Sequence, residues 1–108
     1  MKKDYIGTWK IKEMDMWDED YIDLMGTGQI KIGKDGIGSI RFGAVQATLG
    51  CKTAHIGEEE RIEFTFEGSD EGDQCSGRGW MKISRSEMNG RIFFHLGDDS
   101  GFKAIKSK

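Results

Sequence analysis

The sequence contains no proline, and it has only two cysteines and two histidines in 108 residues. It also has no long apolar run, because no window approaches the roughly 20 apolar residues that a membrane-spanning helix needs. Acidic residues outnumber basic ones, the net charge is −3, and the lysines and arginines are dispersed. Nucleic-acid binders usually carry clustered basic residues. We therefore expect neither a membrane span nor a nucleic-acid partner.

The scarce cysteines, Cys51 and Cys75, bear on the location of the protein. Residues 1–5 include two lysines, but no apolar segment of the kind found in a secretory signal follows them. Thiols in a chain without an export signal are usually reduced. The sequence therefore predicts a cytoplasmic protein with free thiols, and nothing in it indicates a cofactor.

Glycine, in contrast, is abundant, with sixteen residues. Glycine supplies the positive-φ turns and the bulges that multi-stranded sheets need, whereas helical bundles use few of them. A hydrophobic fraction of 36% and a charged fraction of 32% suit one soluble globular domain. A chain of this length leaves no room for a second core. We therefore predict an all-β protein whose single domain spans residues 1–108.

Alternation of apolar and polar residues predicts strands along most of the chain. In residues 7–12, Trp9 and Ile11 share one face, and the alternation is clearest in residues 61–67. The dipeptide Asp35-Gly36 lies between two alternating runs and is a strong hairpin signal. The predicted strands cover residues 7–12, 29–33, 37–47, 49–56, 61–67, 79–85, 91–96 and 102–106.

The period changes between residues 15 and 25. Trp17, Tyr21 and Leu24 recur at i, i+4 and i+7, which is typical of one face of a helix, and Gly26 follows as an end signal. Seven or eight strands at a spacing of about 8 to 12 residues indicate a meandering barrel or sandwich. We predict a small antiparallel up-and-down barrel with one short helix between strands 1 and 2.

The position of Gln46 is ambiguous. With a regular register, Phe42, Ala44 and Gln46 share a face of their strand. A bulge at Gly43 would instead place Val45 on the inner face and turn Gln46 outward.

The segment from residue 61 to residue 102 contains most of the chemically reactive side chains, in two acidic, glycine-rich loops. Cys75 and His95 could form a nucleophile and its base, with Asp98 or Asp99 orienting the imidazole and Arg78 favouring the thiolate. No spacing specific to a protease or transferase accompanies these residues. The competing interpretation is a thiol in a loop and a histidine on a strand.

The same loops offer carboxylates for a metal ion. Hard cations take several carboxylate oxygens from loops, and Asp70, Glu71 and Asp73 lie in the first loop, with Asp98 and Asp99 in the second. The spacing lacks the alternation of a calcium-binding loop, and one histidine with one cysteine is a small set for zinc. Solvated turn residues are the competing interpretation.

A third possibility is a pocket inside or at the mouth of the barrel that binds a small, partly apolar ligand. Its polar contacts would be Gln46, Arg78 and His95. Trp80 either lines this pocket or faces outward on a homodimer surface, because it alternates with Lys82. The alternative is a barrel filled by its own side chains. The predicted aromatic wall comprises Trp9, Trp17, Phe42, Phe64, Phe66, Trp80 and Phe94.

Two resemblances accompany these patterns. Gly7-Thr8-Trp9, followed by an acidic helix with Tyr21 and the end at Met25-Gly26, resembles the start of the calycin superfamily, particularly of fatty-acid-binding proteins. This resemblance implies an up-and-down barrel with an internal cavity, in which the tryptophan plugs the closed end. The whole chain, especially residues 68–80 and 90–100, also resembles a group of small bacterial proteins with no assigned activity.

These observations lead us to favour a non-enzymatic binding protein for a small, partly apolar ligand. An enzyme that depends on a thiol or a metal and uses Cys75, His95 and Asp98 is the alternative. A homodimeric partner-binding module that acts through Trp80 and the acidic loops is a further one.

Overall fold

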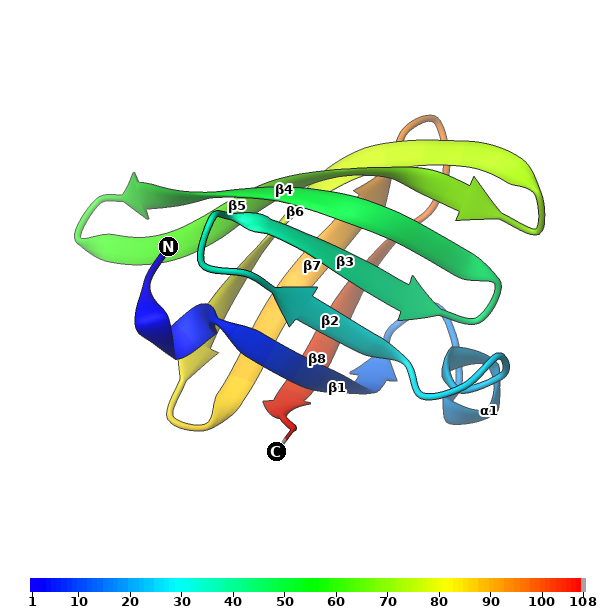
Figure 1. The fold of residues 1–108 in the computed structure, drawn as a ribbon, viewed down its shortest axis with the longest axis horizontal. Helices are drawn as coiled ribbons and strands as arrows, with labels where there is room; N and C mark the ends of the chain where they lie inside the picture. Colours follow the sequence, from blue (N-terminus) through cyan, green and yellow to red (C-terminus); the bar gives the residue numbers. More distant parts are fainter. Residues whose placement is uncertain (108) are drawn as a thin grey trace.

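The computed structural model describes residues 1–107 and shows a closed antiparallel β-barrel (Figure 1). Eight strands follow one another around the barrel in chain order, and the last strand returns to pair with the first. The predicted all-β, up-and-down barrel is confirmed. Its strands are β1 (Gly7–Met14), β2 (Gln29–Ile32), β3 (Ile37–Phe42), β4 (Val45–Ile56), β5 (Glu59–Asp70), β6 (Asp73–Ser84), β7 (Glu87–Phe94) and β8 (Asp99–Lys106).

The three longest strands, β4, β5 and β6, have 12 residues each. The sequence predicted a long acidic loop between the fifth and sixth strands. This prediction is wrong, because β5 continues to Asp70 and β6 begins at Asp73. Only Glu71 and Gly72 form the turn, and both have positive φ. Small and acidic residues have low strand propensity, but pairing with neighbouring strands overrides it.

The predicted strand 37–47 is divided into β3 and β4 by a turn at Gly43. This residue has φ +55° and packs so closely on the Tyr21 ring that a Cβ atom would overlap the ring. The turn reverses the chain, so that Val45 is buried and Gln46 is exposed on the outer face. The orientation of Gln46, which the sequence left open, is therefore outward.

The helix α1 (Glu19–Ile22) lies between β1 and β2 as predicted, but it is shorter than residues 15–25. Asp18 caps its N-terminus with a side-chain oxygen. The predicted apolar face included Leu24, which lies beyond the helix and is 60% exposed, whereas Ile22, outside that predicted face, is 1% exposed. No helix within the described part of the chain has the length and apolar character to cross a membrane.

Apolar side chains pack against one another inside the barrel. A 3₁₀ turn, η1 (Lys3–Tyr5), lies at the end of the barrel opposite α1 (Figure 1). Inside the barrel, aromatic rings lie over glycines of the next strand, as Phe66 does over Gly77 and Phe64 over Gly79. This arrangement lets large rings share a narrow interior. The largest fully buried side chains are Trp9, Phe42, Ile22, Ile30, Ile40, Leu49, Ile62, Met81, Met88, Ile92, Val45 and Ser100.

Candidate functional site

The outer wall of the barrel carries a groove that crosses strands β3 to β7. Two adjoining depressions of about 920 and 800 Å³, both open to solvent, make up this groove. The residues common to both depressions form one row across the sheet, in which each residue is the registered partner of the next. In order, the row consists of Ile37, Gly50, Thr65, Arg78 and Phe93.

The hollow depends on two small residues in the middle of the wall. Gly50 has no side chain and Thr65 has a short one, whereas the larger Ile37 and Phe93 stand at the ends of the row. A Cβ atom at Gly50 would contact only the Thr65 Oγ1 atom, at 3.4 Å. The groove is therefore a consequence of the residue type at position 50, not of a backbone conformation that only glycine can adopt.

Arg78 lies where the two depressions meet. Its guanidinium carbon is 5.8 Å from the centroid of the Phe93 ring. Within residues 1–107 its side chain forms no ion pair, and the nearby carboxylate of Glu63 is paired with Arg61 at 3.2 Å. A guanidinium group presents donors in a planar fork that matches a carboxylate. Arg78 is therefore available to an anionic group, next to an apolar ring.

Trp80 lies at one end of the groove and faces outward, so its side chain is not part of the barrel core. Its partners across the sheet, Glu63 and Arg91, are also outer-face residues, while Met81 beside it is buried. The guanidinium carbon of Arg61 is 5.0 Å from the Trp80 ring centroid. The aromatic face on this side is thus partly covered by a cation.

The other end of the groove is formed by the turn between β7 and β8. The backbone N–H of His95 donates to the Ser76 carbonyl at 2.8 Å, which holds the turn against β6. Leu96, at the tip, is 95% exposed. In contrast to the exposed Leu96, Phe94 packs its ring against that of Phe66, and the ring centroids are 5.0 Å apart.

Several of the residues predicted to form one ligand pocket line the two depressions, and others lie outside them. Arg78 and His95 line the outer groove, and Gln46 is exposed on the outer wall beyond it. Phe94 lines the first depression and Phe64 the second, although Phe64 is only 3% exposed. Trp17 lines neither and packs with other aromatic rings near α1.

The proposed thiol centre is not assembled in the described residues. Cys75 packs against the core, and burial and the nearby Asp70 carboxylate raise the pKa of its thiol. A raised pKa reduces the thiolate population that a nucleophile requires. His95 and Asp98 are exposed, and no hydrogen bond joins either side chain to Cys75 within residues 1–107. The second thiol, Cys51, is also free, and burial raises its pKa to about 11.

The acidic residues do not gather into a metal site. Asp70 and Asp73 pair across the β5–β6 turn, whereas Asp98 lies in the β7–β8 turn and Asp99 begins β8. Asp99 accepts a hydrogen bond from Arg91 at 2.6 Å. Residues 1–107 contain no group of three or more His, Cys, Asp or Glu side chains arranged to hold a metal ion.

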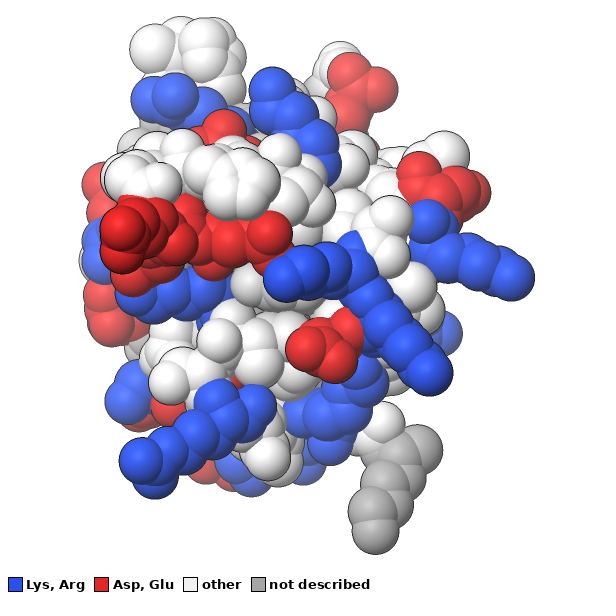
Figure 2. All heavy atoms as spheres, turned by 90° about the vertical axis from the view of Figure 1, so that its left-hand side faces the viewer, with Lys and Arg blue, Asp and Glu red and all other residues white. Residues whose placement is uncertain are grey.

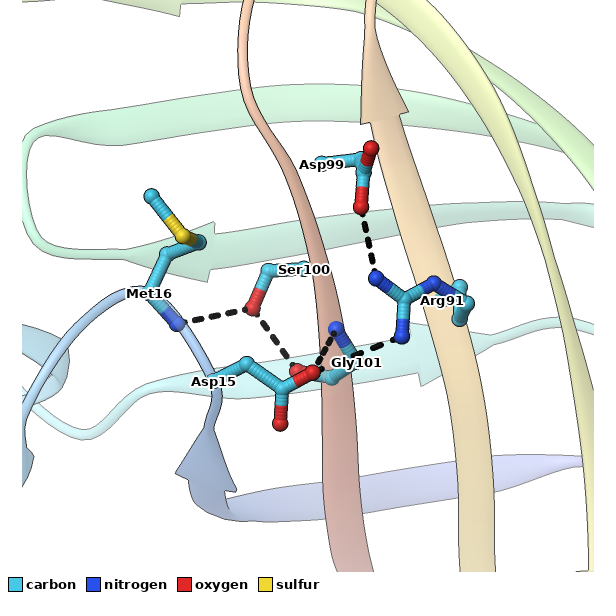
Figure 3. Close-up of polar contacts among 6 residues, drawn as sticks. All are labelled: Asp15, Met16, Arg91, Asp99, Ser100 and Gly101. Atoms are coloured by element: carbon cyan, nitrogen blue, oxygen red, sulfur yellow. Dashed lines mark hydrogen bonds and ion pairs between the residues drawn. The ribbon is translucent and has the colours of Figure 1, made fainter.

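A polar network between β1, β7 and β8 was not recognised in the sequence (Figure 3). Asp15 accepts hydrogen bonds from the Gly101 N–H at 3.0 Å and from Arg91 at 3.4 Å. The buried Ser100 hydroxyl accepts from the Met16 N–H at 3.2 Å and donates to the Gly101 carbonyl at 2.8 Å. The available signal was that Ser100 alternates in phase with the apolar residues of its strand. This network attaches the segment after β1 to β8.

The residues of the groove itself were mostly missed. Ile37 and Phe93 are apolar side chains on the outer face, out of phase with their buried neighbours Ile40 and Ile92. That irregularity was the only local signal.

No known protein family, curated protein or solved structure matches this chain. The closed eight-stranded barrel with one short helix is consistent with a calycin-like small barrel. The case for a function therefore depends on the geometry of the groove.

Proposed function

We propose that this protein is a non-enzymatic binding protein whose outer groove takes a small, partly apolar ligand with an anionic group. One observation carries this proposal: Arg78 has no ion-pair partner in the described residues and lies at the centre of the groove beside Phe93. The guanidinium group would bind a carboxylate or sulfonate. Ile37 and Phe93 would contact the apolar part of the same molecule.

The remaining residues predicted to contact the ligand would differ in how directly they do so. His95 and Trp80 would contact ligands long enough to reach the two ends of the groove. Phe64 and Phe94 would form part of the floor of the groove, and Trp17 would act at a distance through the core. Gln46 would contact only a ligand that extends beyond the groove.

The likeness to lipocalins extends, in this proposal, to the capture of small molecules, with the outer wall in place of an internal cavity. We also propose a cytoplasmic location, where Cys51 and Cys75 would remain the free thiols they are in the structure. A homodimer is part of the same proposal, and its contact is considered below.

The proposal is tested with 8-anilinonaphthalene-1-sulfonate, a fluorescent anion with an apolar ring system, added to the full-length chain. We expect saturable binding, with NMR shift changes centred on the amides of Thr65 and Phe93. Arg78→Gln should weaken binding roughly tenfold or more, because a hydrogen bond to a charged group contributes about 1.5–3 kcal/mol. Native mass spectrometry of gently purified protein would show any ligand retained from the cell.

A second variant keeps the test independent of Arg78. Gly50→Val adds a side chain above Thr65, where the only close contact is at 3.4 Å, and should block the groove without unfolding the barrel. Gln46→Val places the same side chain on the outer face of the same strand and should bind as the wild type does. Unsaturable binding, or binding that neither Arg78→Gln nor Gly50→Val weakens, would refute the proposal.

A further inference from the structure

One side of β4 has no partner strand along part of its length. β4 pairs with β5 over the whole range Val45–Ile56, but β3 pairs with it only as far as Gly50. The Cys51 N–H then donates to the Gly36 carbonyl at 2.8 Å. From residue 52 to residue 56, no strand among the described residues covers this side, and β4 extends past β3 in Figure 1.

The unpaired backbone groups on this edge belong to Thr53 and His55. In an antiparallel ladder, alternate residues direct both their N–H and C=O groups toward the same neighbouring strand. Cys51 directs its N–H away from β5, so the residues two and four positions later do the same. Each offers one donor and one acceptor. An open edge of this kind can pair with a strand of another chain.

We infer that this edge is a self-association site, where β4 of a second copy pairs antiparallel around a two-fold axis at Ala54. In this register, Thr53 of each copy lies opposite His55 of the other. The pairing forms four N–H···O=C hydrogen bonds. Ala54, a small side chain, meets its own copy on the axis, and Lys52 lies opposite Ile56 of the other copy.

A second copy can pair with this edge because two identical antiparallel strands match about a two-fold axis. The open stretch, residues 52–56, is symmetric about Ala54, and a register moved toward Gly50 is blocked by the β2–β3 turn at Gly36. Its ladder with β5 has no register shift, and no proline interrupts it. Both bulges and prolines would protect an edge from pairing.

The charged and apolar side chains along the β4 edge are compatible with pairing to a second copy of the chain. Antiparallel pairing places Lys52 opposite Ile56, so the two lysines do not face each other across the axis. Ile56 is 55% exposed in the single chain, and the aliphatic part of Lys52 would cover it. Figure 2, which views the end of the barrel where β4 meets β5, shows basic and acidic side chains intermixed, so a second copy would not meet a face of one charge.

The test combines sedimentation equilibrium with amide hydrogen exchange of the full-length chain over a wide range of protein concentration. We expect the mass to approach that of two chains, and the Thr53 and His55 amides to become at least tenfold slower to exchange as it does so. The amide of Ala54, which faces β5, should be protected throughout. A chain that stays monomeric, or a dimer that leaves both edge amides unprotected, would overturn the inference. The second result would place the contact elsewhere, for example at Trp80.

Two variants separate edge pairing from folding. Thr53→Pro removes one open-edge donor in each copy, so the dimer loses two hydrogen bonds. Since a hydrogen bond contributes about 1 kcal/mol, the dimer should weaken roughly thirtyfold. Ala54→Lys places two like charges on the axis and leaves the backbone unchanged, so it should also yield monomer. Gln46→Lys, on the part of β4 that β3 covers, should dimerise as the wild type does. Wild-type dimerisation by Ala54→Lys would contradict the register.

Discussion

The side chain of Lys106, at the end of β8, contacts the ring of Trp9 in β1. Its Nζ atom lies 4.7 Å from the centroid of the Trp9 ring. The same atom donates hydrogen bonds to the carbonyls of Asp4, at 3.0 Å, and of Ile6, at 2.6 Å. One residue near the end of β8 therefore stabilises both the first strand and the 3₁₀ turn that precedes it.

We predict that Lys106→Met destabilises the fold by about 1–2 kcal/mol, because it removes a cation–π contact and two charge-assisted hydrogen bonds. Urea unfolding measures this change. Lys103→Met is the matched control on the same strand. Within residues 1–107, Lys103 forms a single ion pair, with the exposed Glu13 carboxylate at 3.4 Å, so its loss should change the free energy of unfolding by less than about 0.5 kcal/mol. Equal effects of the two substitutions would contradict the role assigned to Lys106.

The two glycines at positions 79 and 50 should respond in opposite ways to the same substitution. A Cβ atom at Gly79 would overlap the Arg91 carbonyl and lie 2.5 Å from the Phe64 ring. Gly79→Ala should therefore destabilise the barrel by about 3 kcal/mol. Gly50→Ala should be neutral or stabilising, because its Cβ atom has room and alanine reduces the entropy of the unfolded chain. Thermal unfolding of the two variants makes the comparison, and a stable Gly79→Ala protein would show that both the Phe64 ring and the backbone at Arg91 can move aside.

The ion pair between Lys2 and Glu60 should make a small part of the stability dependent on pH. Lys2 donates to Glu60 at 2.6 Å and holds the pKa of that carboxyl below its ordinary value, and His55 acts in the same direction. A carboxyl group whose pKa is lowered by folding stabilises the protein above its ordinary pKa, and this contribution is lost as the pH falls through its folded pKa.

We therefore expect Lys2→Gln to be less stable than the wild type at neutral pH, and the difference to disappear in acid once Glu60 is protonated. Urea titrations at both pH values measure it. Lys2 is exposed and Glu60 is only partly buried, so the effect should also shrink in high salt. A difference that persists in acid would mean that Lys2 stabilises the fold by other contacts.

Much of the fold was readable from local pattern. The alternation of Ile62, Phe64 and Phe66 correctly placed these residues inside the barrel, and Trp9 and Ile11 likewise. The least readable parts were the turns. Gly43 was singled out as a possible bulge but forms a turn that separates two strands, and Glu71 lies in a two-residue turn that does not stand out among many acidic residues.

The candidate site was less readable than the fold. Arg78 and Trp80 were selected by residue type, but neither their neighbours nor their side of the wall could be derived. Gly50 attracted no attention, because a missing side chain has meaning only when the residues around it are known.

The sequence by itself determined the class of the protein: alternation of period two selects strands, and this alternation also determines which side chains avoid water. Only the tertiary structure decided which strands are neighbours. Ile37, Gly50, Thr65, Arg78 and Phe93 are separated by 13 to 15 residues in the chain and meet in one row because of the pairing register. The uncovered edge of β4 has the same origin, since it exists only because β3 is shorter than the strand it pairs with. Both features arise from long-range hydrogen bonding, which short-range pattern does not encode.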